Sequence, residues 1–295
     1  MTRPNPPARV RVLLARKAPV GVVFRRGPSK WVQVLRWDTT TDTFEAGQWF
    51  HGRLHERRCD LSPGGDLLVY FASKIDGRTI RDREYTHAWT AISRPPYLTA
   101  LALWPKGDTW HGGGLFETRR RLWLNHAPEV AIPHPDHRPK FLTVTPNESA
   151  SGEDFPVWSR RMERDGWRRT QAGSYPMTKT GWTTEQPETW ERESPNGDLT
   201  LVQSLDAVDF KQPGGPYRES FTLRDREGRS TPIEDAEWAD WDQAGRLVFA
   251  RAGGLWCLDS HDDTTTERLL VDLTPNEPEE RAAPSWAQEW PFRSD

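Results

Sequence analysis

Abundant tryptophan, frequent turn residues and a recurring turn-and-strand phrase predict an all-β chain, a single β-propeller of six four-stranded blades. Only 35% of the 295 residues are hydrophobic, yet the chain contains 16 Trp, 11 Phe and 5 Tyr. Disordered chains are poor in aromatic residues, so this composition indicates many short, half-buried strands. The 25 Pro and 22 Gly are typical of frequent turns and argue against long helices.

The recurring phrase consists of a Trp or apolar residue, a small polar residue, a Gly-bearing turn and an apolar strand. It reads LSPGGDLLVYFA at 61–72, ESPNGDLTLVQS at 193–204 and WDQAGRLVFARAGGLW at 241–256. Successive copies begin about 45 residues apart, the length of one propeller blade. Looser copies cover 103–116, 158–170 and 283–291.

Local turn chemistry supports the antiparallel strands of such blades. Asp165-Gly166 and Asn196-Gly197 are dipeptides that favour tight hairpin turns, here between predicted strands. The segment 30–50 predicts an outer hairpin of the first blade. The runs LLVYF and LVFA are continuous and apolar, as expected for strands buried on both faces. No long segment has a helical period.

A second repeat predicts how blades connect and how the ring closes. The segments 142–159 and 271–287 share TPNE followed by Pro-x-Trp, which indicates a connection between blades. The last phrase, 283–291, is predicted to be an inner strand that pairs with strands from about residues 10–57. One propeller domain over 10–295 would follow a flexible Pro-rich arm over 1–9. Five or seven blades are alternatives to six.

These repeats resemble those of a known family. Leu-Thr-x-x-Pro, a polar stretch, Pro-x-Trp-Ser and a turn before an apolar strand are similar to the repeat of TolB-like propellers, the WD40-like β-propeller repeat. The resemblance is strongest at 59–73, 142–160 and 190–290. It implies a six-bladed fold, a binding role and a bacterial protein, and it carries no catalytic residues. Leu61 and Glu193 stand where that repeat often has Trp.

The net charge and the cysteine content limit which binding partners and which cellular compartment are expected. The formal net charge is −3, which gives no broad electrostatic footprint for nucleic acid or an anionic membrane. Two cysteines, Cys59 and Cys257, do not make a disulfide framework. The N-terminal residues have no secretory pattern and no stretch approaches a membrane span. We therefore expect a cytoplasmic protein.

The interval 108–137 departs most from the repeat and is the densest polar region. Long insertions between strands are where scaffolds place function. Its triple glycine, Gly112-Gly113-Gly114, predicts a turn between strands, because a phosphate-binding loop would need a following helix. The interval also offers metal-ligand side chains, but they follow no fixed ligand spacing, so we predict no metal and no cofactor. These side chains are Asp108, His111, His134, Asp136 and His137.

Other chemistry-bearing residues have structural explanations in the sequence. Two basic clusters, Arg119–Arg121 and Arg160–Arg169, predict exposed strand faces with cross-strand ion pairs, and single-stranded nucleic acid is the alternative ligand. Cys59 and Cys257 lie in apolar strand context and are predicted to be inert. Channel carboxylates of a hydrolase would come from aspartates that flank inner strands. Those aspartates are Asp60, Asp66, Asp198, Asp206, Asp209, Asp240 and Asp242.

The sequence predicts a non-catalytic scaffold or adaptor that binds a protein partner, with no catalytic residues. One alternative is a small-ligand or carbohydrate-directed site, including a hydrolase, in the central channel; another is a nucleic-acid-associated propeller. Trp and Arg dominate binding hot spots. The predicted partner-binding residues are therefore Trp110, Arg119, Arg120, Arg121 and Trp123, although Trp110 and Trp123 also fit the blade core.

Overall fold

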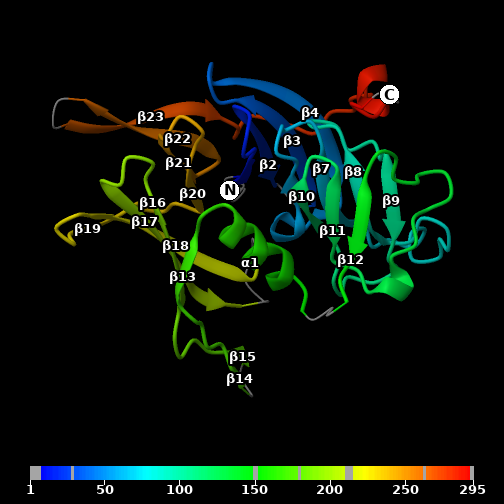
Figure 1. Cartoon of the computed structure of the whole chain (residues 1–295), viewed down its shortest axis with the longest axis horizontal. Coiled ribbons are helices and arrows are strands. Elements are labelled where there is room, and N and C mark those ends of the chain that lie inside the picture. Colours follow the sequence, from blue (N-terminus) through cyan, green and yellow to red (C-terminus); the bar gives the residue numbers. More distant parts are fainter. Residues whose placement is uncertain are drawn as a thin grey trace, which may run out of the picture. The chain divides into compact units, whose positions relative to one another are not determined.

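The chain is all-β, as predicted, and divides into two compact units (Figure 1). Of the described residues, unit 1 includes those within 12–161 and 276–292, and unit 2 includes those within 8–11 and 162–275. The predicted single domain over 10–295 stays a prediction. The structure, a computed structural model, describes residues 8–27, 30–148, 152–178, 181–209, 215–261 and 264–292.

Unit 1 contains three blade-like sheets, coloured blue, cyan and green in Figure 1. The first contains β1 (Arg9–Leu14), β2 (Val20–Arg26), β3 (Trp31–Asp38) and β4 (Thr43–His51), in chain order. The second contains β5 (Arg53–Leu54), β6 (Asp60–Leu61), β7 (Leu68–Ser73), β8 (Ala88–Ser93) and β9 (Ala102–Pro105). Its strand order is β5-β7-β8-β9, and β6 also pairs with β7. The third contains β10 (Gly114–Thr118), β11 (Arg121–Leu124) and β12 (Thr143–Pro146). β12 pairs parallel with β11, a departure from the antiparallel pattern.

The middle sheet of unit 1 is buried on both faces. Alternate residues of a strand point to opposite faces. In β7, Leu68 and Tyr70 pack with Phe24 and Val34 of the first sheet, whereas Val69 packs in a second cluster that includes side chains of β10 and β11. All six residues of β7 are buried. The continuous apolar run at 67–71 is therefore explained by contacts with both neighbouring sheets.

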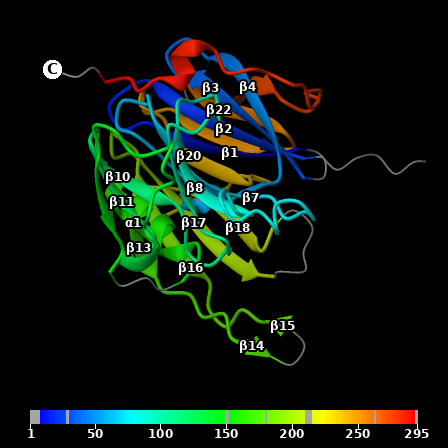
Figure 2. The same cartoon turned by 90° about the vertical axis from the view of Figure 1, so that its right-hand side faces the viewer.

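Unit 2 contains two further blade-like sheets. One has the order β13-β16-β17-β18-β19, with β13 (Arg168–Gln171), β16 (Glu188–Glu193), β17 (Leu199–Val208), β18 (Tyr217–Asp225) and β19 (Ser230–Pro232). The other contains β20 (Trp238–Trp241), β21 (Leu247–Arg251), β22 (Gly254–His261) and β23 (Thr264–Asp272), in chain order. A small hairpin of β14 (Met177–Thr178) and β15 (Gly181–Trp182) extends away from the five-stranded sheet (Figure 2).

Three copies of the predicted phrase form equivalent turns. The N–H groups of Gly65, Gly197 and Gly245 donate to the carbonyl oxygens of Ser62, Ser194 and Asp242 at 2.9, 2.9 and 3.0 Å. These glycines have φ values of +75°, +72° and +81°, a region that glycine adopts without strain. The side-chain oxygen of the first turn residue accepts a further backbone N–H, from Leu67, Leu199 and Arg246 respectively. The phrase is thus a physical repeat of capped turns.

The predicted strand before the Asp165-Gly166 turn is wrong, because Phe155–Arg164 forms the helix α1, whereas the strand predicted after the turn forms as β13. Val157, Trp158 and Met162 are buried at helical spacing. The helix ends in paired hydrogen bonds, from Gly166 N–H to Glu163 O at 3.2 Å and from Trp167 N–H to Met162 O at 2.9 Å. Such a Schellman motif needs a left-handed residue, here Gly166 with φ +89°. The Asp-Gly dipeptide therefore ends a helix instead of turning a hairpin.

Six blades and ring closure by paired terminal strands are not confirmed; the described residues form five blade-like sheets. The predicted inner strand at 283–291 is wrong, because Ser285–Gln288 forms the 3-10 helix η3. The segment 30–51 forms β3 and β4 as predicted, within a sheet that already has four strands. Of the predicted arm, residues 1–7 lie outside the described residues, Ala8 is buried and Arg9 begins β1.

Candidate functional site

The predicted binding interval begins at one end of the strands of unit 1. β7 ends at Ser73 and β9 at Pro105, and antiparallel pairing with β8 places both ends together. The loops 74–87 and 106–113 therefore lie at the same end. The segment 125–137 follows β11 at this end and returns to β9, where His134 N–H donates to Leu103 O at 2.8 Å. We call this region the loop end of unit 1.

A buried arginine organises the loop end. Arg58 belongs to the 3-10 helix η1 (Glu56–Arg58) and is 1% exposed. Its guanidinium donates to the carbonyl oxygens of Thr109, at 2.7 Å, and His111. It also forms ion pairs with Glu153, at 3.0 Å, and with Asp154. Because a buried charge needs compensating partners, these contacts fix loop 106–113 and the start of α1 on one guanidinium.

Two exposed aromatic residues are sequence neighbours of residues that bind this arginine. Trp110 is 56% exposed and lies between the two residues whose carbonyl groups bind Arg58. Phe155 is 45% exposed and directly follows Asp154. The backbone of both is therefore held by one buried ion-pair network while their rings face solvent. We call this pair the Trp110–Phe155 surface.

The triple glycine forms the predicted turn into a strand. Gly112 and Gly113 have φ values of +97° and +80°, and Gly114 begins β10. The N–H of Gly112 donates to Asn125 O at 2.9 Å, and that of Gly113 to Thr90 Oγ1 at 2.8 Å. Because two of its amides bind protein atoms, the segment is a tight structural turn.

Glu84, His134 and Asp136 offer ligand atoms that lie within 4.8 Å of one another. The Nδ1 of His134 accepts the Asp136 N–H at 3.2 Å, and its Nε2 lies 3.3 Å from Glu84 Oε1. A neutral imidazole that accepts at Nδ1 carries its proton at Nε2 and donates it to Glu84. Tyr85 stacks on this ring at 4.4 Å. The cluster thus joins loop 74–87 to the segment 125–137 through hydrogen bonds and stacking.

Two buried histidines of unit 1 are held in the neutral form. The Nε2 of His55 lies 3.2 Å from Ser73 Oγ, and burial, with a smaller effect of nearby Arg58, lowers its pKa to about 2. The Nε2 of His126 lies 2.8 Å from Thr90 Oγ1, and burial lowers its pKa to about 4. Both groups disfavour the charged imidazolium in the folded protein.

We expect the free energy of unfolding to fall as the pH drops from 6.5 towards 4. The folded pKa values lie below the unfolded value of about 6.5, so the unfolded chain takes up the extra protons. The contribution of these two histidines to the free energy of unfolding is fully present above pH 6.5. Below that pH it decreases by up to about 1.4 kcal/mol for each histidine and each pH unit. Urea denaturation at pH 7, 6 and 5 should show a smaller decrease in His126→Gln than in the exposed control His51→Gln. Equal decreases would contradict the assignment.

The other predicted partner-binding residues do not join Trp110. Arg119, Arg120 and Arg121 lie at the β10–β11 turn, at the far end of β10. Arg119 pairs with Asp66 at 2.8 Å, and Arg121 lies 3.5 Å from Glu117. The guanidinium groups of Arg119 and Arg120 lie 5.0 and 5.1 Å from the ring centroid of Phe292. Their predicted binding role stays a prediction.

Trp123 lies in the core, which was the alternative given by the sequence. It is buried and packs with Leu115 and Val157. The guanidinium of Arg160 lies 4.3 Å from its ring centroid. The five predicted residues are therefore spread over two ends and the interior of unit 1.

The second basic cluster is engaged within the protein. Arg168 and Arg169 of β13 pair with Glu191 and Glu188 of β16 at 3.3 and 2.6 Å, as predicted for cross-strand ion pairs. Arg161 differs, because it lies on α1 and donates to the carbonyl oxygens of Glu56 and Cys59. These guanidinium groups have protein partners, which favours the structural explanation over nucleic-acid contacts.

The predicted aspartates include several with structural partners. In unit 1, buried Asp60 accepts the Phe116 N–H at 2.7 Å. In unit 2, Asp242 caps its turn and pairs with Arg246 at 2.7 Å, and Asp198 pairs with Arg226 at 2.8 Å. Asp240 pairs with Arg192, although burial raises its pKa. These contacts fit turn caps and ion pairs.

Both cysteines are buried thiols outside any disulfide. Burial raises the pKa of Cys59 to about 12 and that of Cys257 to about 11. The reactive form of a cysteine is the thiolate, so both side chains are protonated and unreactive near neutral pH. This supports their predicted structural role.

The Arg58 network was not predicted. Nothing in HERRCD at 55–60 distinguishes a buried arginine from an exposed one. A signal for α1 was available, because Asp154 precedes Phe155-Pro156 as a helix N-cap precedes a proline in the first turn.

No protein-family model matches the chain, and no curated protein matches it. Among the described residues, no helix is both long enough and apolar enough to cross a membrane.

Proposed function

We propose that this protein is a non-catalytic scaffold that binds a protein partner through the Trp110–Phe155 surface. The observation that carries the proposal is the 56% exposure of Trp110 on a loop whose backbone is bound by buried Arg58. Tryptophan is enriched at the energetic centres of protein interfaces. A loop that is already ordered loses less conformational entropy on binding. Blade-like sheets are also consistent with an interaction scaffold.

The titration of buried groups supports the non-catalytic part of the proposal. A catalytic acid, base or nucleophile needs a pKa near the working pH and access to substrate. His55, His126 and Cys59 are buried, and burial shifts each of them away from neutrality towards its uncharged form. These three groups are therefore poor candidates for a catalytic acid, base or nucleophile at neutral pH. Buried thiols at both cysteine positions also fit the expected reducing, cytoplasmic compartment.

A photo-crosslinking amino acid at position 110 tests the contact surface. In cells of the native source, we expect it to capture the same protein as a crosslinker at position 155. A crosslinker at Met177, which is 73% exposed on the small hairpin of unit 2, should not capture it. With the purified partner, Trp110→Ala should weaken binding by at least about 30-fold, the effect of a hot-spot residue of about 2 kcal/mol.

The triple variant Arg119→Ala, Arg120→Ala, Arg121→Ala separates the two predicted groups of contacts. These arginines are exposed, so the variant should melt close to the temperature of the native chain. If it abolishes binding while Trp110→Ala does not, the contact surface lies at the other end of unit 1. A turnover that depends on His111, His134 or His137 would contradict the non-catalytic proposal.

A further inference from the structure

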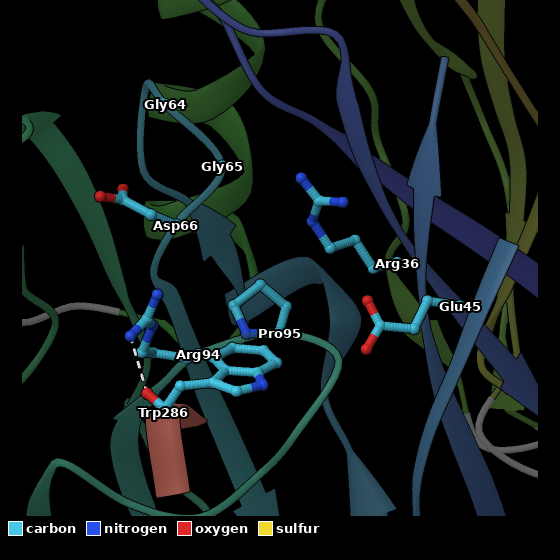
Figure 3. Close-up of a pocket in the computed structure, with 8 residues that line it drawn as sticks. All are labelled: Arg36, Glu45, Gly64, Gly65, Asp66, Arg94, Pro95 and Trp286. Carbon is cyan, nitrogen blue, oxygen red and sulfur yellow. Dashed lines mark hydrogen bonds between the residues drawn. The ribbon is translucent and has the colours of Figure 1, made fainter. Parts of the chain in front are cut away.

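A pocket of about 310 Å³ lies at the other end of the strands of unit 1, away from the Trp110–Phe155 surface (Figure 3). It is lined by the capped turn that precedes β7, by residues that follow β8, by the β3–β4 pair and by η3. Known small-ligand pockets begin at about 300 Å³. The volume suits a ligand the size of a single ring with a charged group.

Among the residues that the structure describes, Arg36 has no side-chain ion-pair or hydrogen-bond partner at this pocket. It lies on β3 directly opposite Glu45 of β4, and Figure 3 shows both side chains at one side of the pocket. Although the two residues are cross-strand neighbours, no ion pair within 4.0 Å joins them among the described residues. The guanidinium of Arg36 therefore has its five N–H donors available to a ligand.

Arg94 supplies a second guanidinium with a vacant donor. Its Nη1 donates to the carbonyl oxygen of Trp286 at 2.7 Å, the dashed line in Figure 3. Its Nε is buried and has no hydrogen-bond partner among the described residues. The pKa of Arg94 is lowered overall, because the effect of burial exceeds the opposite effect of nearby Asp66 and Glu289. An unsatisfied buried donor is unfavourable. Arg94 also adds a second positive charge to the lining of the pocket.

The charges of the pocket favour an anion. Asp66 is already paired with Arg119 at 2.8 Å and accepts the Ser62 hydroxyl at 2.7 Å. Among the charged residues that line the pocket, this leaves Arg36 and Arg94 against Glu45, an excess of one positive charge. Guanidinium groups bind carboxylates and phosphates through two parallel hydrogen bonds. Glu45 would repel the same ligand and limit its affinity.

Trp286 gives the pocket an apolar wall. Its indole is 41% exposed, lies 4.8 Å from the Arg94 guanidinium and is supported edge-on by Tyr97 at 5.5 Å. An exposed indole face held by two neighbours can stack with a flat organic group. The wall is therefore placed beside one of the two cations.

Gly64 leaves the pocket open at the turn. The equivalent residues of the two other capped turns are Asn196 and Ala244, so the turn itself accepts a side chain at this position. A Cβ on Gly64 would meet only the Asp66 Oδ1, at an ordinary contact distance of 3.6 Å. The turn therefore does not require glycine at this position, and the missing side chain leaves this part of the pocket lining open.

From these observations we propose that the pocket binds a small organic anion, with its carboxylate or phosphate held by the Arg36 guanidinium and a flat apolar part against Trp286, beside the positive charge of Arg94. Both oxyanions offer the same paired acceptors. This site is independent of the proposed protein-binding surface, and either proposal can hold without the other.

Calorimetric titration of the full chain with benzoate, phenyl phosphate, inorganic phosphate and benzamidine tests the site. We expect saturable one-site binding of benzoate or phenyl phosphate, with a Kd of about 1 mM or lower. The compound that binds more tightly shows whether the pocket prefers a carboxylate or a phosphate. Inorganic phosphate should bind at least about tenfold more weakly than the preferred ring compound, because it lacks the part that stacks on Trp286. The cation benzamidine should not bind.

Four variants assign the binding to the pocket. Arg36→Gln should weaken the preferred anion at least about tenfold, the usual effect of losing a charged hydrogen bond. The exposed control Arg53→Gln should leave it unchanged. Glu45→Gln should strengthen binding because it removes repulsion, and Gly64→Asn should weaken it by filling the opening while the melting temperature stays near that of the native chain. If no ring anion saturates, or if Arg36→Gln binds as well as Arg53→Gln, the proposal is overturned.

Discussion

Replacing Arg58 by Met is expected to lower the free energy of unfolding by about 3–5 kcal/mol, the usual result of removing one partner from a buried ion pair. The change leaves the Asp154 carboxylate and the carbonyl oxygens of Thr109 and His111 without their donor. Thermal and urea denaturation would measure the loss. Limited proteolysis should show earlier cleavage within 106–113, because that loop loses its anchor.

Two further variants separate the network from a general effect of charge. Arg119→Met removes a surface pair to Asp66, with the arginine side chain 59% exposed, and should change stability by about 1 kcal/mol or less. Adding Asp154→Asn to Arg58→Met should recover part of the lost stability, because it removes the uncompensated carboxylate. Equal losses in the Arg58 and Arg119 variants would show that the buried network is not an anchor.

Gly113→Ala is expected to destabilise the protein by about 3 kcal/mol or more. An added Cβ would lie 2.0 Å from the carbonyl oxygen of Arg58, so backbone must move. The φ of +80° adds a penalty of about 1–2 kcal/mol for an L-residue, and overpacking typically adds about 1–3 kcal/mol. Urea denaturation should show the loss.

Gly77→Ala is the matched control for the glycine prediction. An added Cβ at Gly77 meets no atom within 4 Å. The substitution should be neutral or slightly stabilising, by about 0.4–1 kcal/mol, since alanine restricts the unfolded chain. If Gly113→Ala is as stable as Gly77→Ala, the backbone at 112–114 has room that the structure does not show.

Turns and strands are predicted most reliably from the sequence where the chemistry of neighbouring residues decides the structure. A capped turn depends on a serine or aspartate and a glycine three residues later, so Ser62–Gly65, Ser194–Gly197 and Asp242–Gly245 can be located from sequence alone. The strands β7 and β21, which follow two of those turns, can be predicted from their continuous apolar runs. The segments 158–170 and 283–291 share only tryptophan and spacing with the repeat. A helix replaces the predicted strand before Gly166, and a 3-10 helix replaces the predicted strand at 283–291.

The candidate site could be predicted only in part, because it depends on long-range contacts. The interval around Trp110 was identified from its irregularity, and its exposure agrees with a contact surface. Arg58, Asp154 and Phe155 are joined across about 100 residues, and no local pattern signals such an ion pair. Arg36 and Arg94 meet at a pocket for the same reason. Side chains brought together by sheet packing are not encoded in the spacing of any single segment.

The capped turns separate positions that are constrained from positions that can vary. The first residue and the glycine are constrained by hydrogen bonds and backbone conformation, whereas the residue before the glycine is Gly64, Asn196 or Ala244. A mutation at that third position can alter the surface of one blade without disturbing the turn that starts its next strand. Blades that share this turn can therefore differ in surface chemistry by a single substitution at the third position, while the hydrogen bonds and backbone conformation of the turn are kept.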